Sequence, residues 1–522
     1  MSLLRSTLTV GGMTMASRVL GFVRDVIMAG LLGAGPVADA FVVAFRLPNL
    51  FRRFVGEGAF NSAFVPIFAK RLEAEGLASA RRLAEEVLSV LLVALLAFTL
   101  LAQMAMPVLA YGLAFDYADD PERWPLLVEF SRIAFPYLLF MSLVALYSGM
   151  LNSIGRFAAA SAVPIFLNLT LIAALFVLTP LLPTAGHALA WGVAAAGAVQ
   201  FLFLVLAAGR SGLILRLRRP RLTEGVRRVL ILGLPGVLAG GATQINLLVG
   251  TQIASMEKDA NSILYYADRI FELPLAIIGT AMGVVLLPDL ARRLRGGDEA
   301  GAHRQMNRAI ELSALFTIPS AVALVMIPTE IISVLFERGA FGPDDTARVG
   351  AALVAFACGL PAFVMIKVFA PGFFAREDTA RPMRYAAVGV AVNIVASLCL
   401  FFAFGFVGIA IGTSLGAWAN AGLLAWRLHA QGDFRPDPRL LTRLVKILVA
   451  AAGMGGALWV LAFALEGLFA QGGILGMVAL ALLVAGGGLA YLAAAIGLGA
   501  LDPRELRAMI ARAPRPAPES AP

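Results

Sequence analysis

Charged residues lie inside segments of this chain that are otherwise apolar enough to cross a lipid bilayer. Arg18, Arg24 and Asp25 occupy the first such segment, and Asp39 and Arg52 follow soon after it. A charge at membrane depth costs several kcal/mol or more, and it usually faces a protein-lined, water-filled cavity. Because guanidinium groups bind phosphate oxygens through paired hydrogen bonds, these arginines predict a cavity for a phosphorylated anion.

The spacing of the first charges supports this interpretation. Arg18 and Arg24 are six residues apart, about 600° of helix rotation, so they lie within roughly 120° of each other. Asp25, next to Arg24, can hold its guanidinium and lower the cost of burying it. The alternative is that these charges form structural ion pairs only. A single Arg–Asp pair would favour that alternative, whereas arginines from several spans favour an anion site.

Further charged positions extend the candidate site into both halves of the chain. Glu57, between two glycines, is expected to pair with cavity arginines or to take up a proton during transport; the alternative is an acid near the membrane surface. Arg269 supplies a guanidinium from the second half, in a span comparable to that of Arg52. The secondary candidates are polar residues beside these positions or within apolar spans: Ser17, Arg53, Asp268, Glu272 and Lys367.

The composition is that of a polytopic membrane protein. Of its 522 residues, 60% are hydrophobic and only 14% charged, against about half and a quarter in soluble domains. Both cysteines lie in apolar runs and the three histidines are far apart, which argues against a disulfide framework or a metal site. No phosphate-binding loop or nucleophile elbow occurs. We therefore expect neither an enzyme nor a bound cofactor.

Apolar stretches predict an all-α fold of about 14 transmembrane helices, centred at roughly 20, 55, 97, 140, 170, 198, 240, 278, 317, 360, 393, 418, 455 and 485. The net charge of +9 is concentrated in alternate connections between these spans, so it predicts topology rather than nucleic-acid binding. The positive-inside rule then places both termini in the cytoplasm. The basic connections would also attract anionic membrane lipids.

An internal repeat divides the spans into two lobes. Residues of the first half align with identical residues 225 positions later: Pro136 with Pro361, Arg156 with Arg381 and Asn168 with Asn393. Six spans separate the aligned segments, so the lobes are parallel repeats, an arrangement typical of alternating-access transporters. The predicted parts are an N-lobe at 1–215, a C-lobe at 216–432, two further helices at 433–502 and a partly disordered tail at 503–522.

Several segments together resemble the MurJ/MviN family of bacterial lipid II flippases, within the multidrug/oligosaccharidyl-lipid/polysaccharide exporter superfamily. The resemblance extends over essentially the whole chain. It is carried by Thr14–Asp25, Asp39–Phe41, Arg46–Arg53, Glu57–Phe60, Ala63–Pro66, Tyr265–Arg269 and Ala370–Phe373.

The resemblance implies transport of lipid II, the undecaprenyl-pyrophosphate-linked disaccharide-pentapeptide, from the inner to the outer leaflet of the bacterial plasma membrane for peptidoglycan synthesis. It also implies that the last two helices form a groove for the lipid tail. It further implies that the central cavity is lined by charged residues, namely Arg18, Arg24, Asp25, Asp39, Arg52, Glu57 and Arg269. Cell-wall synthesis proteins are potential partners.

One feature departs from the family pattern. Some members are thought to couple to sodium through an acidic residue on the seventh span, but residues 234–255 contain no Asp or Glu. Neutral Thr243, Gln244, Asn246, Asn393 and Thr413 remain. Coupling to Na+ or H+ is therefore left unassigned. The alternatives to a lipid II flippase are an exporter of another lipid-linked oligosaccharide or of drugs, a membrane enzyme of lipid-linked sugars, and a scaffold for cell-wall enzymes.

Overall fold

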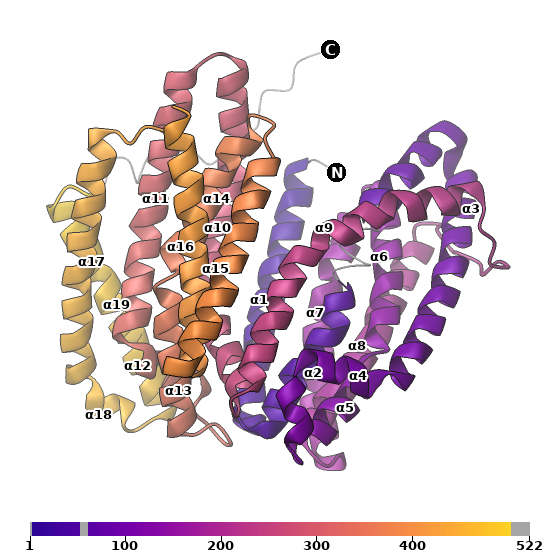
Figure 1. The fold of residues 1–522 in the computed structure, drawn as a ribbon, viewed down its shortest axis with the longest axis horizontal. Helices are drawn as coiled ribbons and strands as arrows, with labels where there is room; N and C mark the ends of the chain where they lie inside the picture. The colour runs from indigo at the N-terminus through magenta and orange to yellow at the C-terminus, as the bar shows by residue number, and fades with distance from the viewer. Residues whose placement is uncertain (1–2, 53–60, 503–522) are drawn as a thin grey trace. The chain divides into compact units, whose positions relative to one another are not determined.

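The structure is a computed structural model that describes residues 3–52 and 61–502, without the side chains of 3–8, 61–62, 234–243 and 280–285. Regular structure in the described ranges is helical (Figure 1). The helices of the first half are α1 Leu3–Leu32, α2 Pro36–Arg52, α3 Asn61–Met104, α4 Met106–Leu113, η2 Phe115–Asp119, α5 Arg123–Ala134, α6 Tyr137–Ser153, α7 Phe157–Leu178, η3 Thr179–Leu181 and α8 Ala185–Gly209.

The second half continues the same pattern. Its helices are α9 Glu224–Ser255, α10 Ala260–Arg295, α11 Glu299–Met326, α12 Pro328–Phe336, α13 Pro343–Ala357, α14 Leu360–Phe374, α15 Ala380–Phe404, α16 Phe406–Ala430, α17 Pro438–Ala464, α18 Glu466–Phe469 and α19 Gly473–Gly497.

Ten helical segments within the described residues are long and apolar enough to cross a membrane. Three of these segments combine two helices: α5 with α6, α7 with η3, and α13 with α14. The helical architecture with these ten candidate spans confirms the predicted all-α membrane fold, and the total of about 14 spans stays a prediction. The predicted second centre, near residue 55, lies outside the described residues, and the helix that follows α1 ends at Arg52.

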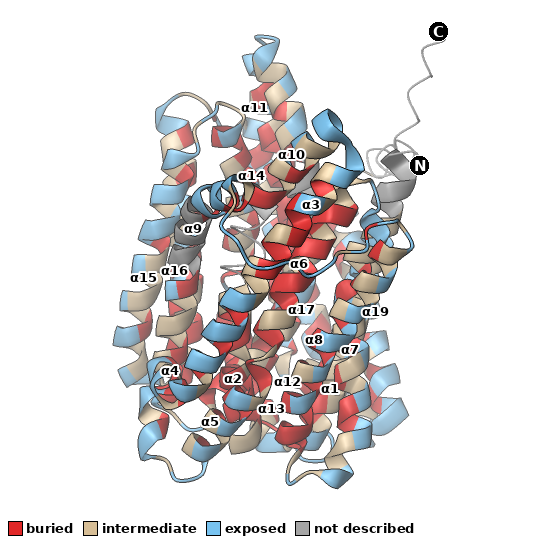
Figure 2. Ribbon diagram, turned by 90° about the vertical axis from the view of Figure 1, so that its right-hand side faces the viewer, coloured by how far each residue is buried: buried red, intermediate tan, exposed pale blue. Residues whose placement is uncertain are grey.

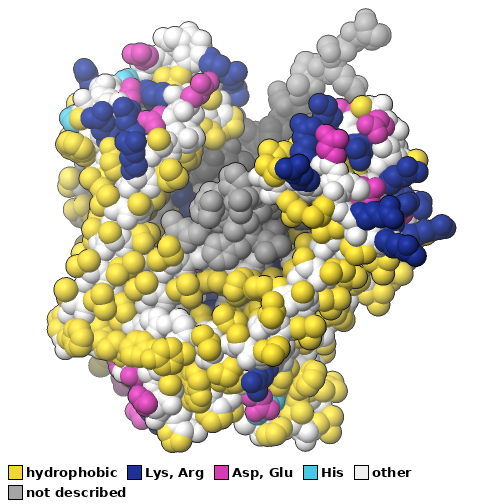
Figure 3. Space-filling view, turned by 45° about the vertical axis from the view of Figure 1, so that its right-hand side comes forward, with side chains coloured by type: hydrophobic (Ala, Val, Ile, Leu, Met, Phe, Trp, Pro, Cys, Tyr) yellow, Lys and Arg dark blue, Asp and Glu magenta, His cyan; other side chains and the backbone are white. Residues whose placement is uncertain are grey.

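The surface of the helices is suited to lipid. Large apolar side chains such as Phe402 on α15 and Phe463 on α17 are 79% and 75% exposed. Figure 2 shows the contrast between α6, mostly buried, and α15, mostly intermediate or exposed. Figure 3 shows that hydrophobic side chains cover much of the face in view, and that most of the Lys and Arg side chains on this face lie toward the top of the view. Exposed apolar surface of this extent marks a membrane-facing protein rather than an ordinary soluble one.

Packing divides the chain into two compact units. The first contains Met1–Tyr266 and Phe336–Asp345, and the second contains Ala267–Leu335 and Thr346–Pro522. Helix α9, which the repeat places in the C-lobe, packs on α3 and belongs to the first unit. Helix α17 packs on α11, so the last two spans belong to the second unit. The units are defined by packing, and the repeat-based lobes stay a prediction.

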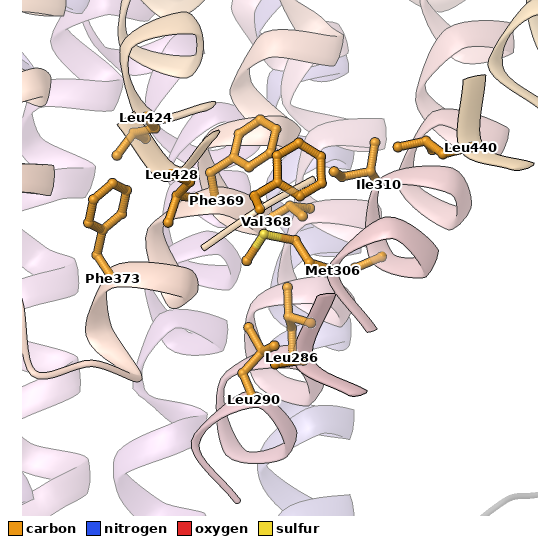
Figure 4. Packing of buried hydrophobic residues seen from close by; sticks show 13 residues of the cluster. Leu286, Leu290, Met306, Ile310, Val368, Phe369, Phe373, Leu424, Leu428 and Leu440 are labelled. Atoms are coloured by element: carbon orange, nitrogen blue, oxygen red, sulfur yellow. The ribbon is translucent and has the colours of Figure 1, made fainter. Parts of the chain in front are cut away.

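Close helix approach and apolar packing hold the second unit together. Gly408, Gly412 and Gly416 recur every four residues on one face of α16, and a Cβ at any of them would come within 3 Å of an atom of α15. Such small residues let membrane helices approach closely. Figure 4 shows a buried cluster in which Met306 of α11, Phe369 of α14 and residues of α10, α16 and α17 pack together.

Candidate functional site

Arg24 and Asp25 form the centre of the candidate site in the first unit. Their side chains are 12% and 3% exposed, and the Arg24 Nη2 lies 2.7 Å from the Asp25 carboxylate. The Nε of Arg24 also donates to Asp25, at 3.0 Å. The Tyr265 hydroxyl donates to Asp25 at 2.8 Å and accepts from Arg24 Nη2 at 3.2 Å. The predicted pairing of Asp25 with Arg24 is therefore present, with Tyr265 of α10 as an added partner.

Asn168 of α7 holds the other edge of the same guanidinium. Its Oδ1 accepts from Arg24 Nη1 at 3.0 Å, and its Nδ2 donates to the Ser17 carbonyl at 2.9 Å and lies 3.4 Å from the Ser17 hydroxyl. The predicted secondary residue Ser17 is thus linked to Arg24 through this amide. In the sequence Asn168 appeared only as a marker of the repeat, although a polar amide in an apolar span was itself a signal.

Asp39 lies in a separate, fully buried network. Its carboxylate accepts from the Tyr117 hydroxyl and from the Ser262 backbone N–H at 2.8 Å, and Arg123 Nη1 lies 3.8 Å away. Burial, together with the charge of Asp39, raises the pKa of the Tyr117 phenol well above its ordinary value, so Tyr117 stays protonated and donates. Asn261 Nδ2 donates to the same hydroxyl at 3.2 Å.

Two arginines extend this network. Arg46 of α2 donates to Thr251 Oγ1 and, at 2.8 Å, to Asn261 Oδ1. Arg123 donates to Asp120 at 2.6 Å. Burial alone would raise the pKa of Asp120, but hydrogen bonds from Arg123 and its neighbour lower it overall, so Asp120 is charged at neutral pH. The partners of Asp39 were missed in the sequence, because they come from η2 and from the first turns of α5 and α10.

The remaining predicted residues of the first unit are placed in different ways. Arg18 is exposed on α1, and Arg52, at the end of α2, donates from Nε to Asn49 Oδ1 at 3.3 Å. Arg53 and Glu57 lie outside the described residues. The structure therefore brings together Arg24, Asp25 and Ser17, and it gives Asp39 and Arg52 other neighbours.

The second unit carries its own charged group on α10. Arg269 Nη1 lies 2.9 Å from the Glu272 carboxylate, and Asp268 is half-buried beside it. Lys367 of α14 is exposed, and its side chain lies over Gly279 of α10, where a Cβ would meet it at 2.7 Å. Glu272 and Gly279 are seven residues apart and share a helix face, so α10 gathers opposite charges along one side.

The neutral polar residues considered for an ion occupy both units. Gln244 is buried and Asn246 half-buried on α9, whereas the Thr243 side chain lies outside the described residues. In the second unit Asn393 Oδ1 accepts from Ser397 at 3.0 Å and from Thr413 at 3.4 Å. Within the described residues, no group of three His, Cys, Asp or Glu side chains could hold a metal ion.

Ten candidate membrane spans among the described residues, together with a charged pair buried on α1, define a polytopic membrane protein of the transporter type. Solved structures show the same fold. One described as "Lipid II flippase MurJ, inward closed conformation" matches with a TM-score of 0.77 at 24% identity, over 96% of this chain and 100% of that one. An inward-facing MATE multidrug transporter of the MOP superfamily matches with a TM-score of 0.67 at 15% identity, over 82% and 98%.

Sequence comparisons identify the family. The family model "Lipid II flippase MurJ" matches residues 28–480. A probable lipid II flippase MurJ of Rhizobium meliloti is 48% identical over 88% of this chain and 87% of the relative. One of Rhizobium tropici is 45% identical over 100% and 98%. The chain belongs to the MurJ family.

Proposed function

We propose that this chain moves lipid II from the inner to the outer leaflet of the bacterial plasma membrane, acting as a transporter rather than a catalyst. Family membership over most of the chain supports this, because the relatives are named lipid II flippases. Neighbours of this fold include MATE transporters described as inward-facing and as outward-facing, which supports an alternating-access cycle. Both termini would be cytoplasmic by the positive-inside rule.

The observation that carries the proposal is the buried guanidinium of Arg24. A buried arginine held by Asp25, Tyr265 and Asn168 is an oriented donor group. When a pyrophosphate arrives, its oxygens can replace some of these acceptors, so that one set of charge-assisted hydrogen bonds is exchanged for another. Arg269, which now pairs with Glu272, is the proposed donor of the second unit.

Charge movement supplies part of the driving force. An anion carried outward across an inside-negative membrane gains about 2.3 kcal/mol per charge per 100 mV. Residues 234–255 of α9 contain no Asp or Glu, so they offer a cation only neutral oxygen ligands. We therefore propose that the membrane potential drives transport, with Na+ or H+ as the ion that would complete the cycle.

The leading test follows lipid II by leaflet in the native bacterium. Depletion of this protein should leave lipid II in the inner leaflet, and normal arrival at the outer leaflet without a substitute flippase would refute the proposal. The same measurement separates the alternative, an exporter of another lipid-linked oligosaccharide, because lipid II would then cross normally while the other lipid accumulated.

A residue-level test uses the same assay. Arg24→Ala should abolish complementation at normal protein levels. Arg24→Lys keeps the charge but loses the planar donor pair, so its activity should fall roughly 10-fold or more. Arg82→Ala, at an exposed position on α3, is the matched control and should complement fully. Full activity of Arg24→Ala would refute the pyrophosphate site.

A further inference from the structure

Asn168 is a buried amide whose hydrogen-bond partners all lie on α1. The side chain comes from α7, whose other core residues are apolar, and Asn168 is only 6% exposed. The Ser17 carbonyl and hydroxyl lie at its Nδ2, and Arg24 Nη1 lies at its Oδ1. A polar group at this depth needs partners, and every one of these bonds joins α7 to the charged helix.

The chemistry of the partners fixes the orientation of this amide. A guanidinium only donates, and a backbone carbonyl only accepts. Asn168 must therefore present its oxygen to Arg24 and its nitrogen to Ser17, and the reversed orientation would lose both bonds. Because the Ser17 bond prevents rotation, the acceptor for Arg24 is held at one place on α7.

The two contacts converge although Ser17 and Arg24 are two helical turns apart. A helix carbonyl points toward the C-terminus, whereas side chains lean toward the N-terminus. The Ser17 carbonyl oxygen and the Arg24 guanidinium therefore approach each other on the face of α1 that carries Gly21. A Cβ at Gly21 would lie 3.5 Å from Asn168 Nδ2, which places the amide directly over this bare stretch of α1.

We infer that Asn168 is a positioning residue for Arg24, a role that rests on the proposed binding of pyrophosphate by that arginine. Asp25 lies on the same helix and is carried with Arg24 whenever α1 moves. Asn168 instead fixes the opposite edge of the guanidinium to α7. Contacts at both edges set the plane of the group, so less side-chain freedom is lost when phosphate oxygens bind it.

The test compares two leucine variants of the purified full-length protein. Asn168→Leu removes the acceptor for Arg24. Gln200→Leu is the matched control, because Gln200 is a 1% exposed amide on α8 that donates to Val163 O of the same α7 at 2.8 Å. Each protein is titrated with a short-chain polyprenyl pyrophosphate and with the corresponding polyprenyl alcohol.

Asn168→Leu should weaken pyrophosphate affinity by about 10-fold and leave the alcohol affinity unchanged, while Gln200→Leu should change neither. In an Arg24→Lys background Asn168→Leu should have little further effect, since coupled residues are non-additive in a double-mutant cycle. If the leucine variant does not fold, Asn168→Asp serves instead. It keeps an acceptor for Arg24 and adds a negative charge, so pyrophosphate affinity should again fall selectively.

Two outcomes overturn the inference, and they differ in what else they overturn. If Asn168→Leu matches Gln200→Leu, or adds fully to Arg24→Lys, the amide serves packing alone and the proposed function stands. If the wild-type protein binds the pyrophosphate no better than the alcohol, the proposed anion site fails, and the role of Asn168 fails with it.

Discussion

Replacement of Tyr117 by Phe tests the buried network around Asp39 by removing a single oxygen atom. The Tyr117 hydroxyl donates to Asp39 and accepts from Asn261 Nδ2. Phe keeps the ring and its packing, so the change isolates the polar contribution. Asp39 would keep the Ser262 N–H at 2.8 Å and Arg123 Nη1 at 3.8 Å, but it would stay buried with one donor fewer.

The expected cost follows from the two bonds that are lost. A hydrogen bond to a charged group contributes about 1.5–3 kcal/mol and a neutral one about 1 kcal/mol. Tyr117→Phe should therefore cost about 2.5–4 kcal/mol. Tyr491→Phe is the matched control, because the buried Tyr491 hydroxyl donates to a neutral acceptor, the Leu315 carbonyl, at 2.7 Å. It should cost about 1 kcal/mol.

Thermal unfolding of the purified proteins in one detergent provides the assay. For compact units of this size, a loss of about 1 kcal/mol in the free energy of unfolding lowers the midpoint by about 2 °C. Tyr117→Phe should then shift the midpoint by about 5–8 °C, and Tyr491→Phe by about 2 °C. Equal shifts would show that the Tyr117 hydroxyl contributes no more than an ordinary neutral bond, and the assignment of Asp39 as a buried charge held by this hydroxyl would be wrong.

Gly33→Ala should destabilise the protein more than Gly155→Ala, measured by the same thermal assay. Both glycines have positive φ, which costs Ala about 1–2 kcal/mol, but a Cβ at Gly33 would lie 2.5 Å from the Ala340 carbonyl oxygen and one at Gly155 would meet nothing within 4 Å. Similar midpoints would contradict this close approach. In proteoliposomes, a membrane potential that is negative on the cytoplasmic side of the protein should speed the movement of lipid II away from that side, and a potential of opposite sign should slow it. An unchanged rate would exclude drive by the membrane potential.

Much of the fold could be predicted from the sequence, because lipid imposes simple rules. Every backbone polar group must be satisfied within the membrane, so long apolar runs become helices. The equivalent prolines of the repeat, Pro136 and Pro361, fall where α5 gives way to α6 and where α14 begins. Hydropathy could not predict that α9 packs with the first unit, because that depends on side-chain fit against α3.

The charged residues at the centre of the candidate site were predicted from the sequence, whereas their neutral hydrogen-bond partners were missed. The cost of burying charge made Arg24 and Asp25 visible in the sequence, and the structure brings them together. Tyr265 and Asn168 were not predicted as partners, because a polar residue in an apolar span indicates that a partner is needed but not which residue it is. Their role depends on which helices pack side by side, and spacing along one helix contains no such information.

The repeat shows how one kind of side chain can serve different chemistry in the two units. The offset of 225 pairs Asn168 with Asn393. The first accepts from the Arg24 guanidinium, and the second accepts from the hydroxyls of Ser397 and Thr413. An amide offers both donors and an acceptor, so it can stay at one position of a repeat while its partners change. At this pair of positions the two units therefore differ in the partners of the amide, and Arg24 is the partner that makes the first amide part of a charged site.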